Sequence, residues 1–160
     1  MKTYEKGLTC VTTIYGPVGE TSLLPHLKPS PTFPLTNNGN IGGPKGDSKG
    51  GSGLAWQFDA GSPGKLVVTM ANKGSVPIAG SYFILMLGPV NDDGLYDYTV
   101  VTNSLGTSLF LLARDPLKFK LVYQDDVVVE LAARGFDKNW NKPIETYQGR
   151  DCVYPVRQDS

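Results

Sequence analysis

The fold class is decided by the stretch 81–114, which reads SYFILMLGPVNDDGLYDYTVVTNSLGTSLFLLAR. It holds three runs rich in apolar, β-branched and aromatic residues, at 81–87, 95–102 and 107–114, and these runs predict three strands. Between them lie two groups of turn-forming residues, Asn-Asp-Asp-Gly at 91–94 and Asn-Ser-Leu-Gly at 103–106. Short strands joined by tight turns predict an antiparallel meander and therefore an all-β fold.

The residues before this stretch continue the same pattern. The segment 8–15, LTCVTTIY, is rich in β-branched residues and predicts a strand. The segments 53–60 and 65–70 alternate apolar and polar residues, and Gly-Ser-Pro-Gly at 61–64 predicts the turn between them. At least six short strands at even spacing predict a β-sandwich or a closed barrel.

A different composition marks the region 16–53. It holds many of the chain's 12 prolines and the glycine-rich run IGGPKGDSKGGSG. This run does not fit a phosphate-binding loop, because Lys49 is followed by Gly50 where that motif has Ser or Thr. We expect a long Pro/Gly-rich loop region here, with one short strand somewhere in 33–42.

One helix is expected over 116–134, after the last predicted strand. Asp115 is a favourable N-cap, and Pro116 suits the first helical position. Gly135 stands where a glycine ends many helices, with Phe136 as the accompanying apolar contact. The expected apolar stripe of this helix consists of Leu117, Leu121, Val128 and Leu131, flanked by Phe119 and Val122.

Length and charge exclude several classes of protein. The chain has 160 residues, the size of one domain, and its 15 basic and 15 acidic residues leave no net charge. A protein that binds nucleic acid normally carries a basic excess, so we expect no nucleic-acid partner. No run of apolar residues is long enough to span a membrane. The segment 1–6 lacks the apolar core of a signal peptide, so we expect any export signal to lie outside this chain.

Residues that often carry catalysis stand in structural settings here. His26 lies in the proline-rich segment LLPHLKP, where no known motif pairs it with a nucleophile. Asp92 and Asp93 precede Gly94 in a predicted turn, where Asp is favoured for backbone reasons. The acidic residues expected on the solvated face of the helix are Asp125, Asp126 and Glu130. We expect no catalytic residue, no metal site and no required cofactor.

The two cysteines, Cys10 and Cys152, lie near opposite ends of the chain. Their separation argues against a metal cluster, and the redox motif CxxC is absent. Two interpretations remain: two free buried thiols, or one long-range disulfide. A disulfide closing so long a loop would stabilise the fold by roughly 5 kcal/mol in the chain-entropy model, and it would indicate an oxidising compartment.

Several segments together resemble the lipocalin family. The match begins with YEKGLTCVTTIY (4–15), which is similar to the second strand of bacterial, plant and apolipoprotein-D-like lipocalins. It continues with GSPGKLVVTM (61–70) and GSYFILML (80–87), which resemble their central hairpins. The phrase SLFLLARDP (108–116) resembles their last strand, and GFDKNWNKPIETYQGRDC (135–152) resembles their tail. The order and spacing of the segments make the resemblance specific.

The resemblance implies a single lipocalin-like domain over 1–160, with an up-and-down β-barrel and one C-terminal helix packed outside. It also implies that the tail, 136–160, carries Cys152 into a disulfide with Cys10, and it identifies Arg114 as the remnant of a family motif. The family's first strand, with its Gly-x-Trp motif, has no counterpart here, so the chain resembles a divergent or truncated member. We therefore expect open strand edges at 8–15 and 107–114, which a partner protein or a second copy would pair with.

The family's barrel encloses a ligand cavity, and alternation along the strands predicts which residues line it. If the tail holds Cys10 on the outer wall, then Thr9, Val11, Thr13 and Tyr15 point inward. On the next two strands the more apolar alternate positions are expected inside, whereas the last strands can be covered by the helix on their outer face. Trp140, in the tail, is expected outside the cavity. The expected ligand-binding residues are Val11, Thr13, Tyr15, Leu54, Trp56, Phe58, Leu66, Val68, Met70, Tyr82, Met86, Tyr98 and Phe110.

The function implied by the resemblance is the binding and carriage of a small hydrophobic molecule: a lipid, a sterol, a retinoid-like molecule or a pigment. Two alternatives remain open. One is a soluble accessory subunit of a larger complex, including a membrane-associated one, that docks through the open barrel edge. The other is an isomerase or cyclase on the same barrel that acts on a lipid or pigment, although we expect a binding protein rather than an enzyme. The expected disulfide indicates a secreted, periplasmic or organelle-lumenal protein.

Overall fold

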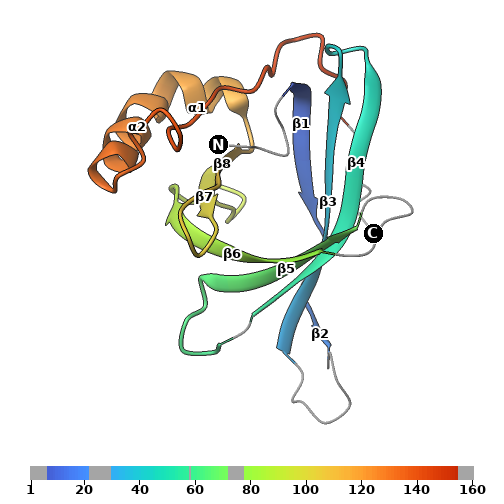
Figure 1. Ribbon diagram of the computed structural model, residues 1–160, viewed down its shortest axis with the longest axis vertical. Helices are drawn as coiled ribbons and strands as arrows, with labels where there is room; N and C mark the ends of the chain where they lie inside the picture. The colour runs from blue at the N-terminus through green and yellow to red at the C-terminus, as the bar shows by residue number, and fades with distance from the viewer. Residues whose placement is uncertain (1–6, 22–29, 58, 72–77, 155–160) are drawn as a thin grey trace. The chain divides into compact units, whose positions relative to one another are not determined.

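The computed structural model describes residues 7–21, 30–57, 59–71 and 78–154, and Figure 1 labels its elements. The chain divides into two compact units. We call Tyr82–Glu145 the helical unit, and Tyr4–Ser81 together with Thr146–Ser160 the large unit. The described residues form mostly antiparallel β-structure with two short helices, which confirms the predicted predominance of antiparallel strands.

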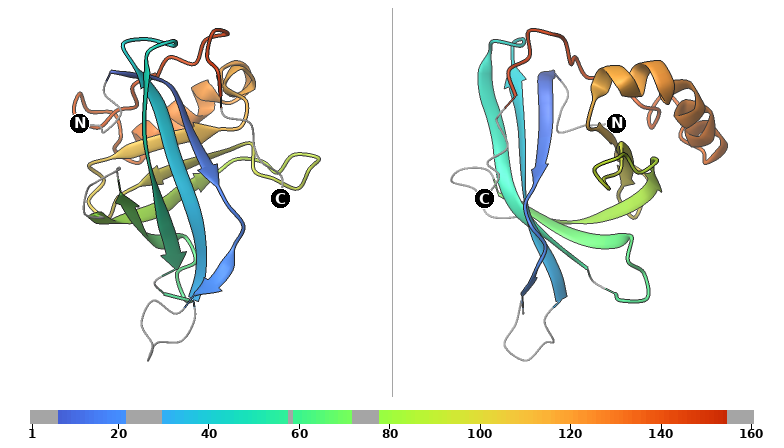
Figure 2. Two further views of the ribbon diagram at one scale, coloured as in Figure 1. Left: turned by 90° about the vertical axis from the view of Figure 1, so that its right-hand side faces the viewer. Right: turned by 180° about the vertical axis from the view of Figure 1, so that it is seen from behind.

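The large unit is built from antiparallel strands that follow one another closely (Figures 1 and 2). Their order across the sheet is β1-β3-β4-β5, with the short β2 paired to β3. The strand β1 begins and ends where the sequence predicts, and β6 (Ile78–Leu87) runs from this unit into the helical unit. The strands are β1 (Leu8–Tyr15), β2 (Gly19–Thr21), β3 (Ser30–Ile41), β4 (Asp47–Gln57) and β5 (Lys65–Ala71).

The prediction of a loop region over 16–53 is wrong for much of its length, because β2, β3 and most of β4 lie there. Glycines permit close strand pairing: a Cβ at Gly53 would overlap the carbonyl oxygen of Thr69 on β5. Pro34 lies where β1 ends, and its carbonyl accepts a hydrogen bond from the backbone of Gly16 at 2.9 Å. Its missing N–H therefore costs no ladder bond between regular strands.

The glycine-rich run supplies both a turn and a strand. Gly42 and Gly43 adopt positive φ values of 79° and 123°, and Gly46 N–H donates to the carbonyl oxygen of Gly43 at 2.9 Å. This backbone conformation is accessible to glycine at little cost, so the chain reverses between β3 and β4. Ile41 then pairs with Asp47, and the two strands remain in register as far as Thr32 and Trp56.

A β-bulge interrupts the alternation of β1. The register shifts between Thr9 and Thr12, and Cys10 adopts a positive φ of 53°. Thr9 and Thr12 consequently both lie on the same side of the sheet, opposite Asn40 and Asn38. The prediction that Thr9 points to the same side as Val11 is therefore wrong, because the extra residue of the bulge reverses the face on which the preceding side chains of β1 lie.

The helical unit places two helices on a three-stranded antiparallel ladder of order β6-β7-β8, with β7 (Tyr98–Thr102) in the centre. Both predicted turns are present. Asn91 Oδ1 accepts hydrogen bonds from the backbone of Asp93 and Leu95, and Gly94 has a φ of 75°. Asn103 Oδ1 closes the second turn in the same way, and β8 (Leu109–Ala113) follows it.

The expected helix begins and ends as predicted but is divided in two. Asp115 Oδ1 accepts hydrogen bonds from the backbone of Leu117 and Lys118, both at 2.9 Å, which confirms the N-cap of α1 (Pro116–Val122). After Tyr123 the chain continues as α2 (Gln124–Ala133). Gly135 has a φ of 89°, and Phe136 N–H donates to the carbonyl oxygen of Leu131 at 2.9 Å, which is a glycine-terminated helix end.

The apolar stripe of the helices differs from the predicted one. Leu131 is buried as expected, but Leu117, Leu121 and Val128 are exposed. The positions that pack toward the core are spaced by four residues and begin at an aromatic residue: Phe119, Tyr123, Val127 and Leu131. The aromatic rings decide this orientation, because Tyr98 on β7 contacts both Phe119 and Tyr123, each at a ring-centroid distance of 5.3 Å.

Candidate functional site

One face of the large unit, which we call the apolar face, gathers many of the predicted ligand-binding residues. A single row crosses four strands, because Tyr15 pairs with Leu35, Leu35 with Gly53, and Gly53 with Met70. Directly paired residues place their side chains on the same face. By the same register this face holds the predicted residues Thr13, Tyr15, Leu66, Val68 and Met70. Val11, in the bulge of β1, also lies there, because a Cβ at Gly39, on the face of Leu35, would lie 3.0 Å from Val11 Cγ2.

The apolar face is only partly buried. Leu35, Ala55 and Leu66 are buried, whereas Tyr15, Val68 and Met70 are half-buried. Tyr15 packs edge-on against Phe33, with ring centroids 5.9 Å apart. Half-buried apolar side chains around a buried floor leave hydrophobic surface that another molecule can cover.

The two faces of β4 are reversed relative to the prediction. Leu54 and Trp56 pair with Pro34 and Thr32, and this register places them on the other face of the sheet. Leu54 is 41 % exposed, whereas Ala55 between them is 1 % exposed. The prediction that Leu54 and Trp56 share a face with Val68 is wrong, because large apolar side chains do not by themselves identify the buried side. Phe58 lies outside the described residues.

The predicted residues of the helical unit separate into two sets. Met86 pairs with Val100, and Met86 and Tyr98 pack against the core formed by Val100, Leu109, Phe119, Val127 and Leu131. Phe110 pairs with Val101 and lies on the opposite face, which is also the face of Tyr82 by alternation along β6. Met86 and Tyr98 therefore serve helix packing, and their ligand contact remains a prediction.

Arg114 and its neighbours form a polar clamp at the start of α1. Arg114 is exposed, and its Nε donates to the carbonyl oxygen of Tyr96 at 2.8 Å. Asp97 Oδ2 accepts hydrogen bonds from Lys118 Nζ and Tyr123 Oη, both at 2.7 Å. These contacts join the loop before β7 to both helices.

The contacts around Asp97 shift the pKa values of three members of the clamp: Asp97, Lys118 and Tyr123. The hydrogen bond from Lys118 holds the pKa of Asp97 below its usual value of 3.8. The same bond raises the pKa of Lys118, and the bond to the Asp97 carboxylate raises the pKa of Tyr123. Opposite charges that stabilise each other in this way indicate a structural ion pair, since each group is held in its ordinary protonation state at neutral pH.

Cys10 and Cys152 form a disulfide, with their Cα atoms 5.3 Å apart. The tail that carries Cys152 is also hydrogen-bonded to β1. Cys10 N–H donates to the carbonyl oxygen of Tyr147 at 2.8 Å, and Gln148 Nε2 donates to the carbonyl oxygen of Val11 at 2.8 Å. The expectation that the whole edge of 8–15 is open is therefore wrong at Cys10 and Val11, where the tail covers it.

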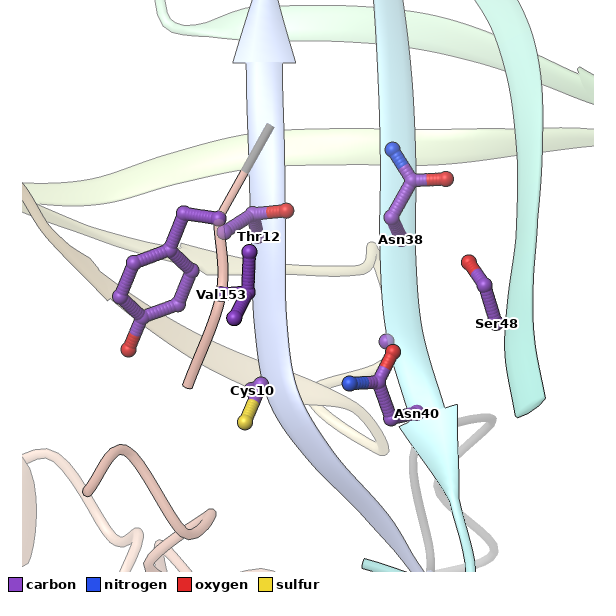
Figure 3. A pocket seen from close by; sticks show the side chains of 8 residues that line it. Cys10, Thr12, Asn38, Asn40, Ser48 and Val153 are labelled. Carbon is purple, nitrogen blue, oxygen red and sulfur yellow. The ribbon is translucent and has the colours of Figure 1, made fainter. Parts of the chain in front are cut away.

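A pocket of about 460 Å³ lies beside this disulfide, on the side of the sheet that we call the tail face (Figure 3). Its polar side chains come from three adjacent strands, as Thr12 pairs with Asn38 and Asn40 pairs with Ser48. Sequence reasoning missed it, although Thr36, Asn38 and Asn40 are a polar alternation on a strand. The lining residues include Cys10, Thr12, Asn38, Asn40, Ser48, Val153 and Tyr154.

The other residues considered for chemistry do not converge in the described part of the chain. Asp92 and Asp93 are exposed in the turn before Gly94, as predicted. Within the described residues no three His, Cys, Asp or Glu side chains gather as metal ligands. His26 lies outside those residues. The described part also contains no helix with the length and apolar character needed to cross a membrane.

No family model, no curated protein and no solved structure matches the chain.

Proposed function

We propose that the protein binds and carries a small hydrophobic molecule, and that the apolar face of the large unit is where the molecule is held. The observation that carries this proposal is the row of paired residues Tyr15, Leu35, Gly53 and Met70, in which three strands supply apolar side chains and those of Tyr15 and Met70 are only half-buried. A sheet face that buried its apolar residues only against its own protein would leave less of them exposed.

Binding would follow from removal of apolar surface from water, since each square ångström that is covered contributes about 25 cal/mol. Polar groups on the same face would orient the ligand. Thr13 lies two residues before Tyr15 on β1 and therefore on the same face, and Gln57 shares this face because it pairs with the buried Leu66. A few polar groups among apolar ones are typical of sites for lipids and pigments.

The proposal includes the up-and-down barrel of lipocalins as the setting of the site. From β3 to β8 the order of the strands in the sheet follows their order in the chain, and β6 belongs to both units, which supports an up-and-down connectivity. The disulfide supports an oxidising compartment, so we propose a secreted, periplasmic or organelle-lumenal location.

Two adjacent valines on β5 provide the test. Val68 pairs with Ala55 on the apolar face, whereas Val67 pairs with Trp56 on the tail face, and both are half-buried. We expect Val68→Ser to weaken binding of the fluorescent fatty acid cis-parinaric acid by about tenfold, the equivalent of about 1.4 kcal/mol. Val67→Ser is the matched control and should leave the affinity within about twofold.

Fluorescence titration of the three proteins measures these affinities directly. Equal weakening by both substitutions would mean that the valines act through general stability. Absence of saturable binding to the unmodified protein would rule out the apolar face as a lipid site.

A further inference from the structure

We propose that the pocket on the tail face binds a neutral carbohydrate, at a site separate from the apolar face. The two sites lie on opposite faces of the same sheet, because successive residues of a strand alternate between them. The pocket volume of about 460 Å³ lies within the usual range for small-molecule sites. The site therefore adds a second ligand class to the proposed function and does not depend on it.

The polar lining of the pocket suits hydroxyl groups. Within the described chain, the side chains of Asn38 and Ser48 make no hydrogen bond, so both are available as donors and acceptors. Asn40 Nδ2 donates to the carbonyl oxygen of Pro44 at 2.6 Å, which fixes the amide and leaves its Oδ1 as an acceptor. Two amides and a hydroxyl on one surface match the alternating donors and acceptors of a sugar ring.

The lining residues that the structure describes carry no charge. The charged residues next to Ser48 are Asp47 and Lys49, and alternation along β4 places both on the opposite face. Among the described lining residues a phosphorylated or carboxylated ligand would find no cation. A neutral ligand is therefore favoured over an anionic one.

The tail contributes an apolar wall to the same pocket. Val153 and Tyr154 line it beside the disulfide, and the Tyr154 hydroxyl donates to Gln148 Oε1 at 2.6 Å. Gln148 is itself bonded to the Val11 carbonyl, so the ring is tied to β1 through one intermediate side chain. An aromatic ring beside amides and hydroxyls can cover the C–H face of a pyranose while the amides bind its hydroxyl groups.

The floor of the pocket has two features that a ligand would use. Thr12 Oγ1 is buried without a hydrogen-bond partner among the described residues, and rotation about its Cα–Cβ bond would turn it toward a bound hydroxyl group. Gly50 lies opposite Asn38, and a Cβ there would overlap the Asn38 side chain. Glycine at this position thus keeps the space that the Asn38 amide occupies.

The experiment is a titration of the ¹⁵N-labelled protein with the disaccharide cellobiose, followed by ¹H–¹⁵N correlation spectra. We expect millimolar affinity, with shifts at Thr12, at Ser48 and at the side-chain amide of Asn38. Ser48→Ala should weaken binding about fivefold, because it removes one hydrogen bond. Ser52→Ala is the control: Ser52 is also exposed and lies on the same strand and face, but it pairs and hydrogen-bonds with Thr36 away from the pocket.

A second arm uses the disulfide. Reduction with dithiothreitol removes the covalent link that holds the tail beside β1 and leaves only its hydrogen bonds, so cellobiose affinity should fall further than in Ser48→Ala. The proposal is overturned if cellobiose produces no saturable shifts, if the shifts lie away from the pocket, or if Ser52→Ala weakens binding as much as Ser48→Ala. Unchanged affinity in the reduced protein also overturns it, because the tail would then have no part in the site.

Discussion

Strand β7 of the helical unit and strand β5 of the large unit differ in how completely their side chains are buried. On β7 the residues Val100, Val101 and Thr102 are all buried. On β5 only Leu66 is buried, and the following residues are half-buried. In the helical unit two helices cover the face that carries Val100, so the apolar residues of that face are committed to packing. The large unit keeps apolar surface available, and this difference is why we place ligand binding there.

The largest expected effect concerns the disulfide of the large unit. Cys10→Ala and Cys152→Ala should each lower the free energy of unfolding by roughly 5 kcal/mol, because either opens the same long covalent loop. Urea denaturation measures the loss, and amide exchange locates it. We expect protection to fall more in β1, where the tail is anchored, than in β7.

Reduction of the unmodified protein is the control for both substitutions, since it should reproduce the same loss without changing a side chain. If exchange accelerates equally in β1 and β7, the two units unfold together and the contrast between them does not extend to stability.

The second effect tests the filled core of the helical unit. Leu131 is 0 % exposed and Leu121 is 76 % exposed, so the two leucines form a matched pair on neighbouring helices. Leu131→Ala should cost about 3 kcal/mol through the lost contacts and the cavity. Leu121→Ala should change stability by less than about 0.5 kcal/mol. Similar losses in the two variants, measured by urea denaturation, would show that the helices pack differently.

The smallest effect is the pH dependence of the clamp in the helical unit. The pKa of Asp97 is lowered in the folded protein, so its contribution to stability is present above the usual value of 3.8 and is lost as the pH falls below it. The pKa of Lys118 is raised, so its contribution is present below 10.5 and is lost as the pH rises beyond that value.

In the unmodified protein, amide protection in β7 should fall as the pH drops from 5 to 2. The substitution Asp97→Asn should remove this fall in β7 and leave the protection of β5 unchanged, as measured by amide exchange over that range. The contribution is modest because the Lys118 side chain is 45 % exposed. An unchanged pH profile in this variant would assign the acid sensitivity to another carboxylate.

Local chemistry made much of the fold predictable. The β-branched run of β1, the Asn91 and Asn103 turns and the Asp115 cap each depend on residues close in sequence. Such features follow from backbone preference and nearby hydrogen bonds, and tertiary contacts do not override them here.

The region of β3 and β4 was not predictable in the same way. Glycine and proline usually mark loops, but here Gly50 and Gly53 are required by the close approach of neighbouring strands. That requirement involves residues on other strands, such as Thr69, and is invisible in the local sequence.

The candidate site shows the same limit at the level of single faces. One bulged residue at Cys10 inverts the face of Thr9, and the small Ala55 is buried in preference to Leu54 and Trp56. Alternation identifies which residues share a face but not which face is covered, since that depends on pairing partners elsewhere in the chain. The polar pocket on the tail face likewise exists only because three strands and the tail meet.

The disulfide between Cys10 and Cys152 has a further consequence, because 142 positions separate the two residues. The chain between them is a closed covalent ring. A protease that cuts the ring once, for example at the exposed turn around Asp92 and Asp93, converts it into an open chain whose two pieces remain bonded. Nicked protein would keep both fragments, with the mass of the intact chain plus one water molecule, until a reductant separates them, so damage at a surface loop would not by itself release either half.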